Sequence, residues 1–174
     1  ISFFPQYSLT TMGSVMDVVK KITKQYSPEP SICFLKNYSK NELFINAIKQ
    51  KIITEGNLTS DEILVVSFHG IPKSYVFKGD KYPIFCEETY LELVKVLGLK
   101  KEQSIMTYQS RFGDEEWLMP YTDEVIIKFA QQRKKVVLIC PGFPVDCLET
   151  LDEINVELRH LYDNNGGISF RYIP

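Results

Sequence analysis

Three glutamates late in the chain, Glu149, Glu153 and Glu157, recur at every fourth position. The segment that carries them predicts an amphipathic helix running to about Tyr162. The apolar residues that share one arc of this helix at the α-helical period are Leu148, Leu151, Ile154, Leu158 and Leu161. The glutamates fall on the opposite side, where like charges four residues apart cost a helix roughly a few tenths of a kcal/mol per pair. A helix seldom carries such a row unless something cationic meets it.

A purely structural interpretation of these carboxylates stays open. Asp146-x-x-Glu149 matches a capping box, with Asp146 as N-cap and Glu149 reaching back from the third helical position. Carboxylates near a helix N-terminus are also favoured by the helix dipole, and a row of glutamates is often a solvated face. Glu157 and His160 have the spacing of half a carboxylate–histidine metal site, but without a second copy they read as a surface pair.

His69 is the second candidate for chemistry, because it directly follows the apolar run 63–68. Histidine titrates near neutral pH, so it suits proton transfer, and its imidazole also binds divalent metals. A lone histidine is more often structural than a ligand. The sequence has only two histidines, however, and placing one of them directly after a buried strand favours the functional interpretation.

Strands and helices alternate along the chain. Apolar runs predict strands at residues 31–35, 63–68, 104–108, 136–140 and 168–172, and helical patterns predict helices at about 14–26, 42–54, 84–97 and 122–133, with residues 73–83 as a long polar connection. This order predicts an α/β fold, a Rossmann-like parallel sheet with helices on both faces. Ligands bind such sheets beyond the carboxyl ends of the strands, which would bring His69 and Glu149 to one edge.

Composition bounds the class of protein. A length of 174 residues predicts one domain, and a net charge of −2 without a basic stripe argues against nucleic-acid binding. The sequence has no apolar run of membrane-spanning length and no leader, and its four cysteines form no C-x-x-C pair, so a reducing compartment, the cytoplasm, is expected. The start at Ile1 suggests a piece cut from a longer chain.

Several motifs together carry a resemblance to a known family. They are Pro5-Gln-Tyr-Ser8-x-x-Thr11-x-Gly13-Ser14, Ser67-x-His69-Gly-Ile-Pro72, Gly79-Asp-x-Tyr82-Pro83, Gln109-Ser-Arg111-x-Gly113, Trp117-Leu118 and Asp146-x-x-Glu149-Thr-Leu. In this order they strongly resemble ferrochelatase, whose members are roughly twice this long and enclose a porphyrin between two similar α/β halves. The chain resembles the second half, so the resemblance implies one chelatase-type domain over residues 1–174, without the N-terminal half and the extreme C-terminus.

The resemblance also implies roles for particular residues. His69 matches the family's cleft histidine, assigned to metal binding or pyrrole proton abstraction, and Glu149 matches the glutamate opposite it. Glu153 and Glu157 match acidic positions that continue this ridge outward. Tyr7 and Trp117 match residues that line the porphyrin site.

The activity implied is insertion of Fe(II) into a porphyrin, with protoporphyrin IX favoured over coproporphyrin III, to form haem. Fe(II) is then a substrate and no cofactor is required. Some members bind an iron–sulfur cluster near a C-terminus that is missing here, so the cysteines, Cys33, Cys86, Cys140 and Cys147, do not indicate one. The expected partners are porphyrin, ferrous iron and the N-terminal half, without which the piece should be inactive; peripheral membrane contact stays open.

Two other functions remain as alternatives. One is a non-catalytic domain that binds a metal or a tetrapyrrole without turnover. The other is a cobalt chelatase acting on an earlier tetrapyrrole, which explains the Gln109-Ser-Arg111 and Trp117 motifs less well.

Overall fold

A four-stranded parallel sheet forms the centre of the computed structural model, which describes residues 3–174. The strands are β1 (Glu62–His69), β2 (Ser104–Gln109), β3 (Lys135–Ile139) and β4 (Phe170–Ile173), in the order β2-β1-β3-β4. All three neighbouring pairs are parallel. Residues 64–68 of β1 are all buried, as expected for a central strand covered on both faces. The predicted α/β fold is confirmed.

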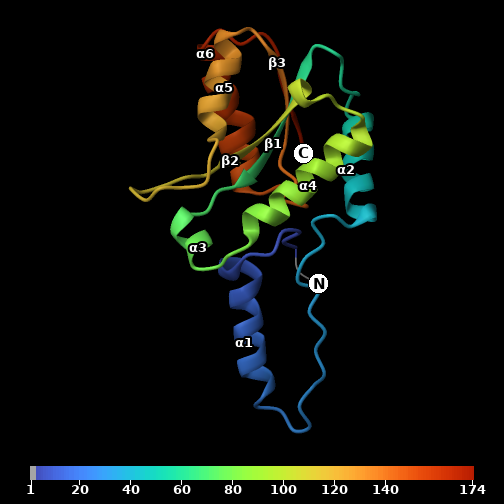
Figure 1. Cartoon of the computed structure of the whole chain (residues 1–174), viewed down its shortest axis with the longest axis vertical. Helices are drawn as coiled ribbons and strands as arrows, with labels where there is room; N and C mark the ends of the chain where they lie inside the picture. Colours follow the sequence, from blue (N-terminus) through green and yellow to red (C-terminus); the bar gives the residue numbers. More distant parts are fainter. Residues whose placement is uncertain (1–2) are drawn as a thin grey trace.

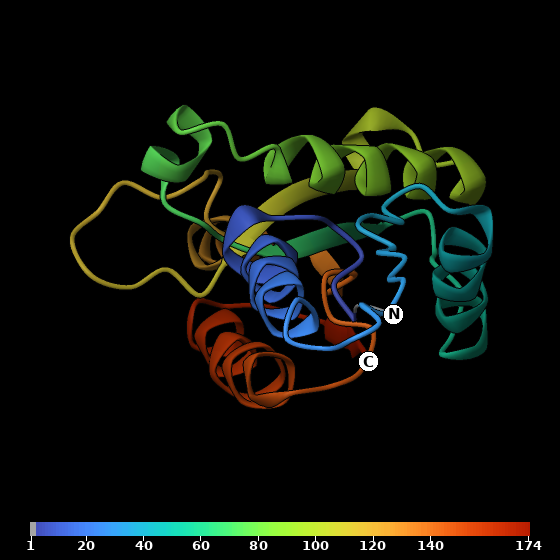
Figure 2. The ribbon, with the colours of Figure 1, turned by 90° about the horizontal axis from the view of Figure 1, so that it is seen from below.

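Helices cover both faces of the sheet (Figures 1 and 2). On one face, α2 (Glu42–Thr54) and α4 (Tyr82–Leu97) pack against Leu64, Val66 and Phe68 of β1. On the other face, Val65 meets α5 (Thr122–Gln131), the π-helix η3 (Glu149–Leu158) and α6 (Arg159–Asn164). The alternation of these side chains along β1 is the period of two that a strand imposes. Short elements complete the chain: the π-helix η1 (Leu9–Gly13), α3 (Lys73–Phe77) and the 3-10 helix η2 (Lys101–Gln103).

One helix stands away from the sheet. The helix α1 (Ser14–Thr23) projects from the body of the molecule, and residues 24–38 return beside it (Figure 1). Its exposed apolar residues include Val15, Val18 and Ile22. Their spacing of three and four places them on one side of the helix.

Two expected features of the chain are wrong. Residues 31–35 form no strand; they belong to the returning segment of the α1 arm, where the backbone lies away from the sheet and Ile32 and Leu35 are exposed. The connection 73–83 is not a continuous loop either, because α3 and the first turn of α4 lie within it. Pro83 fits there because the first turn of a helix needs no hydrogen bond from its nitrogen.

Candidate functional site

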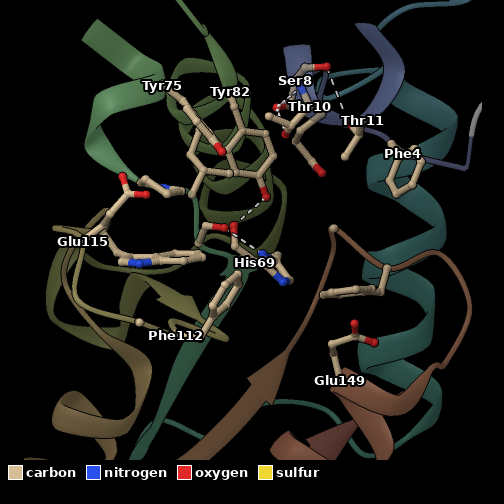
Figure 3. Close-up of a pocket in the computed structure, with 18 of the residues that line it drawn as sticks. Phe4, Ser8, Thr10, Thr11, His69, Tyr75, Tyr82, Phe112, Glu115 and Glu149 are labelled. Atoms are coloured by element: carbon tan, nitrogen blue, oxygen red, sulfur yellow. Dashed lines mark hydrogen bonds between the residues drawn. The ribbon is translucent and has the colours of Figure 1, made fainter. Parts of the chain in front are cut away.

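A cavity of about 550 Å³ lies beyond the end of β1 (Figure 3). Its walls come from the N-terminal loop, the loop after β1, residues 112–117, the loop after β3 and the start of η3. The residues that line it are Phe4, Gln6, Ser8, Thr10, Thr11, His69, Gly70, Ile71, Pro72, Tyr75, Tyr82, Phe112, Gly113, Asp114, Glu115, Trp117, Gly142, Phe143 and Glu149. The structure therefore brings His69 and Glu149, which are far apart in the sequence, to the same pocket.

His69 is the last residue of β1, and its ring is held in a defined tautomer. Its Nδ1 lies 2.7 Å from the carbonyl oxygen of Gly70, which can only accept a hydrogen bond. A neutral imidazole that donates through Nδ1 carries its lone pair on Nε2. The rings of Trp117 and Phe143 are both near it, with centroid distances of 6.5 and 6.4 Å and tilted planes. This arrangement presents a proton acceptor, or a metal ligand, beside two aromatic side chains that also line the pocket.

Trp117 is fixed by the backbone on both sides. Residues 116–118 run antiparallel to the loop after β1: Leu118 N donates to Ile71 O at 3.1 Å, and Lys73 N donates to Glu116 O at 2.8 Å. A Cβ on Gly70 would lie 3.0 Å from Cε3 of Trp117, so the small residue lets the indole approach. The indole Nε1 is buried and has no hydrogen-bond partner within residues 3–174. Such a buried donor is uncommon and costs free energy.

Glu149 begins η3 and points toward the pocket (Figure 3). The pKa of its carboxyl is lowered, first by a hydrogen bond from the Cys147 side chain, then by its own backbone N–H and by the nearby His69. Glu149 is therefore ionised at neutral pH. A carboxylate and an imidazole in one pocket supply a hard anionic ligand and a base.

The other two glutamates of the row lie outside this pocket. Glu153 accepts hydrogen bonds from the backbone N of Ser110 at 2.8 Å and from its Oγ at 2.5 Å. Glu157 is exposed. Both line a separate cavity of about 360 Å³, together with Arg111 and Asp123, which form a 2.8 Å ion pair. Of the three glutamates, only Glu149 therefore lines the pocket of His69, and Glu153 and Glu157 line the separate cavity.

No preformed metal cage is present in the part of the chain that the structure describes: no three His, Cys, Asp or Glu side chains gather as ligands for an ion. A divalent ion held by His69 and Glu149 would take its further ligands from water or from a substrate.

The carboxylate helix differs from the α-helix that the sequence predicts. It is a π-helix, with i→i+5 hydrogen bonding, and its buried residues Thr150, Ile154 and Leu158 recur at every fourth position. Leu148 and Leu151, assigned to the apolar arc, are 74% and 49% exposed. The wider helix turns them away from the core, because its buried face no longer follows the α-helical period.

The capping box is also wrong. Leu148 precedes η3, and no side chain caps this end. Asp146 Oδ1 instead accepts hydrogen bonds from Thr150 Oγ1 at 2.9 Å and from the Tyr172 hydroxyl at 2.8 Å. The carboxylate of Asp146 therefore ties the start of η3 to β4, and Glu149 is left for the pocket.

The aromatic residues at the pocket are only partly those that the sequence names. Trp117 lines it, whereas Tyr7 is outside the lining set and packs its ring edge-on against Phe85 at 6.4 Å, so the porphyrin contact expected of Tyr7 stays a prediction. Tyr82, part of the Gly79-Asp-x-Tyr82-Pro83 motif, and Phe112 also line the pocket. A signal for Phe112 existed, since it directly follows the Gln109-Ser-Arg111 motif at the end of β2.

Across residues 3–174, every helix is too short or too polar to span a bilayer.

The buried and half-buried cysteines near the site, Cys140 and Cys147, are free thiols.

Comparison with known proteins gives one family. The family model described as Ferrochelatase matches residues 1–174. A protein named Ferrochelatase from Hamiltonella defensa subsp. Acyrthosiphon pisum (strain 5AT) is 46% identical over 177 residues, covering 100% of this chain and 55% of that protein. A protein of the same name from Yersinia pestis (strain Pestoides F) is 46% identical over 176 residues, with the same coverage. The chain thus spans about half the length of the curated relatives it matches.

Proposed function

The chain belongs to the ferrochelatase family, and on this basis we propose that it forms part of an enzyme that inserts Fe(II) into a porphyrin to make haem. The observation that carries the proposal is the meeting of His69 and Glu149 in one aromatic-walled pocket. Neither family membership nor the fold alone specifies an activity, since function depends on the site.

Metal insertion requires the loss of pyrrole protons and of the water around the ion. His69 presents its Nε2 lone pair as a base for a pyrrole N–H. The Glu149 carboxylate replaces water on the metal as the ion approaches. Trp117 and Phe143 flank His69 and offer flat faces for the macrocycle. A pocket that fits a bent macrocycle better than a flat one would direct nitrogen lone pairs at the metal and so stabilise the transition state.

Fe(II) acts here as a substrate, and no resident cofactor is needed for this chemistry. The exposed Glu157 and the half-buried Glu153 would receive the ion before Glu149 does. Because the described residues hold no three-ligand cage, the row lowers the energy of an ion along a path without trapping it. Glu153 and Glu157 are therefore proposed to form the route by which Fe(II) reaches Glu149.

Protoporphyrin IX rather than coproporphyrin III is the substrate in this proposal, and the charge of the pocket lining supports the choice. The lining within residues 3–174 includes Asp114, Glu115 and Glu149 but no lysine or arginine. Coproporphyrin III carries more propionate groups, and each needs a cation or several donors to offset its desolvation. A less acidic porphyrin suits this lining better.

The remaining length of the relatives offers a partner for the exposed α1 helix. We propose that this part of the family polypeptide covers Val15, Val18 and Ile22 and closes the pocket from the other side. Burial of an apolar helix face is the usual source of such contacts. The free cysteines fit a reducing compartment, and the cytoplasm is the proposed location.

The test uses a chimaera in which this chain replaces the region it matches in the Hamiltonella ferrochelatase, beside the chain alone. Protoporphyrin IX and Fe(II) are mixed with each protein without oxygen, and porphyrin fluorescence and the Soret band are followed. Loss of fluorescence with the spectrum of haem is expected for the chimaera. Porphyrin that binds but stays metal-free at saturating Fe(II) would instead indicate a non-catalytic binding domain. Faster insertion of Co(II) into an earlier tetrapyrrole would favour a cobalt chelatase.

A further inference from the structure

The last residue of β2 lies directly beside His69. The β1–β2 register pairs His69 with Gln109, and Gly70 N donates to Gln109 O at 2.8 Å. Because the backbone of the sheet fixes Gln109 relative to His69, a group that the Gln109 side chain contacts is also held at a fixed place relative to His69.

Gln109 is buried, and its side chain contacts β1, the residue after β3 and the start of η3. Its Oε1 accepts from Ser67 Oγ of β1 at 2.7 Å and from Cys140 Sγ after β3 at 3.3 Å. Burial raises the pKa of the Cys140 thiol, which keeps this donor protonated. With its oxygen taken by two donors, the amide turns Nε2 toward the carbonyl oxygen of Glu149, 3.5 Å away.

Ser110, the next residue, contacts the same helix one turn later. Its backbone N and its Oγ both donate to the Glu153 carboxylate. Its φ is +63°, in the left-handed region that residues other than glycine seldom adopt. Such a conformation persists where surrounding contacts fix it, and two charge-assisted hydrogen bonds do so here.

We propose that Gln109 and Ser110 are positioning residues: they hold successive turns of η3 at the end of β2 and so keep the Glu149 carboxylate facing His69. Ile154 and Leu158 bury one side of η3, but apolar contacts are non-directional. Hydrogen bonds from the strand end are directional and fix the rotation of the helix about its axis. At the helix start the Asp146 carboxylate ties Thr150 to β4, and the strand-end contacts add the ties to Glu149 and Glu153 themselves.

The catalytic consequence of this clamp rests on the proposed function, whereas its geometry can be tested without any substrate. The variants are Gln109→Leu, which removes the carboxamide, and Ser110→Ala, which removes only the hydroxyl. Thr59→Ala is the matched control, because the Thr59 hydroxyl also donates to carboxylates, those of Asp61 at 2.7 Å and Glu62 at 3.0 Å, at the opposite end of β1.

The first measurement is the titration of the Glu149 side chain by ¹³C NMR, assigned with Glu149→Gln. In the parent chain this pKa lies below the ordinary glutamate value. Both clamp variants should move it partway back toward that value, because η3 turns Glu149 away from His69, and Thr59→Ala should not. Cooperative unfolding shows which of the two variants are folded. If the pKa of Glu149 is unchanged in Ser110→Ala and in Gln109→Leu when it folds, the proposal is overturned. Ser110→Ala decides the matter if Gln109→Leu fails to fold.

The second measurement is metal insertion by the chimaera. The clamp variants should lower kcat about tenfold, since small misplacements of a reacting group are costly, with the porphyrin KM changed less than about twofold. In a Glu149→Gln background the same substitutions should add little, because they act through Glu149. If the titration moves but kcat does not, the clamp stands and the proposed role of Glu149 fails. If both are unchanged, the clamp itself is refuted.

Discussion

The two sides of the pocket are built differently. The strand-end wall, residues 69–73 with 116–118, is joined by backbone hydrogen bonds: Gly70 N to Gln109 O at 2.8 Å, Lys73 N to Glu116 O at 2.8 Å and Leu118 N to Ile71 O at 3.1 Å. The helix wall, residues 142–158, is held to the sheet mainly through side chains, including those of Ser110 and Asp146. The base His69 stands in the first wall and the carboxylate Glu149 in the second.

This difference separates a side that is fixed by its backbone from a side that substitution of a few side chains can adjust. Backbone hydrogen bonds between extended segments leave few alternative geometries, whereas a side-chain contact is lost when one residue is replaced. Under the proposed function, the base and the aromatic face keep the macrocycle in place, and the side-chain contacts of Gln109 and Ser110 hold Glu149 toward the ion. Substitutions in the two walls should therefore have unequal effects.

The largest effect is expected for His69→Ala. Removing the proposed base from the fixed wall should lower the rate of metal insertion by the chimaera by about 10²-fold or more. The free energy of unfolding should change by about 1 kcal/mol or less, because the ring is only half-buried. His160→Ala is the control, since His160 is exposed on α6. Equal rates for the two variants would return His69 to a structural role.

Next in size is the contrast between two glycines, one in each wall. A Cβ on Gly70 would lie 3.0 Å from both Gln109 O and Trp117 Cε3, whereas one on Gly142 would lie 3.7 Å from its nearest neighbours, Gln6 and Phe68. Gly70→Ala should reduce the free energy of unfolding by about 1–3 kcal/mol through overpacking. Gly142→Ala should change it by less than about 0.5 kcal/mol.

Urea denaturation of both variants measures this difference. Similar losses would mean that the two walls are equally tight, and the comparison between them would fail. Tryptophan fluorescence adds a local reading, because Trp117 is the sole tryptophan and lies against Gly70.

The sheet and the shared edge could be predicted because their signals are local. The unbroken apolar run before His69 predicts a central strand, and the alternation of strands and helices places its end beside the segment after β3. Residues 31–35 show the limit of the same signal. An apolar run becomes a strand only where a neighbouring strand can pair with it, and that is a property of the tertiary structure.

The π-helix could not be predicted from the chain for a related reason. The spacing of Leu148, Leu151 and Ile154 fits an α-helix, and no residue there distinguishes i→i+4 from i→i+5 bonding. The contacts that accompany the π-helix, Ser110 to Glu153 and Asp146 to Tyr172, join segments 43 and 26 residues apart. Such pairings are invisible to a periodicity analysis.

Glu153→Gln should have a smaller effect on the free energy of unfolding. The contacts of Glu153 in the structure predict a loss of stability, where the charge pattern of the sequence alone predicts a gain. Like-charge repulsion along the row alone predicts slight stabilisation when Glu153 is neutralised. Because Glu153 accepts two hydrogen bonds from Ser110, we expect a loss of about 1 kcal/mol instead. Thermal melts compare it with Glu157→Gln, which is exposed and should change stability by less than about 0.5 kcal/mol.

The same pair of variants tests the entry route in the chimaera. If the row delivers the ion, Glu153→Gln raises the KM for Fe(II) more than the KM for porphyrin. An unaltered Fe(II) KM would leave Glu153 with only its structural contact to Ser110.

The smallest expected effect is the pH dependence of stability that Glu149 contributes. Its pKa is depressed in the folded chain by the Cys147 side chain, its own backbone N–H and His69. A depressed carboxyl pKa stabilises the fold above the unfolded value, about 4.3, and this contribution is lost as pH falls through the folded value. The parent should therefore exceed Glu149→Gln in stability at pH 6, and the difference should shrink as the pH falls through the lowered pKa of Glu149 in the folded chain. Screening of a half-exposed group in an adjustable wall limits the difference to about 0.5 kcal/mol. Thermal melts of both chains across this range provide the measurement. A gap of the same size at every pH across this range would show that the Glu149 side chain is held by packing rather than by its charge, and the helix wall would then be as rigid as the strand-end wall.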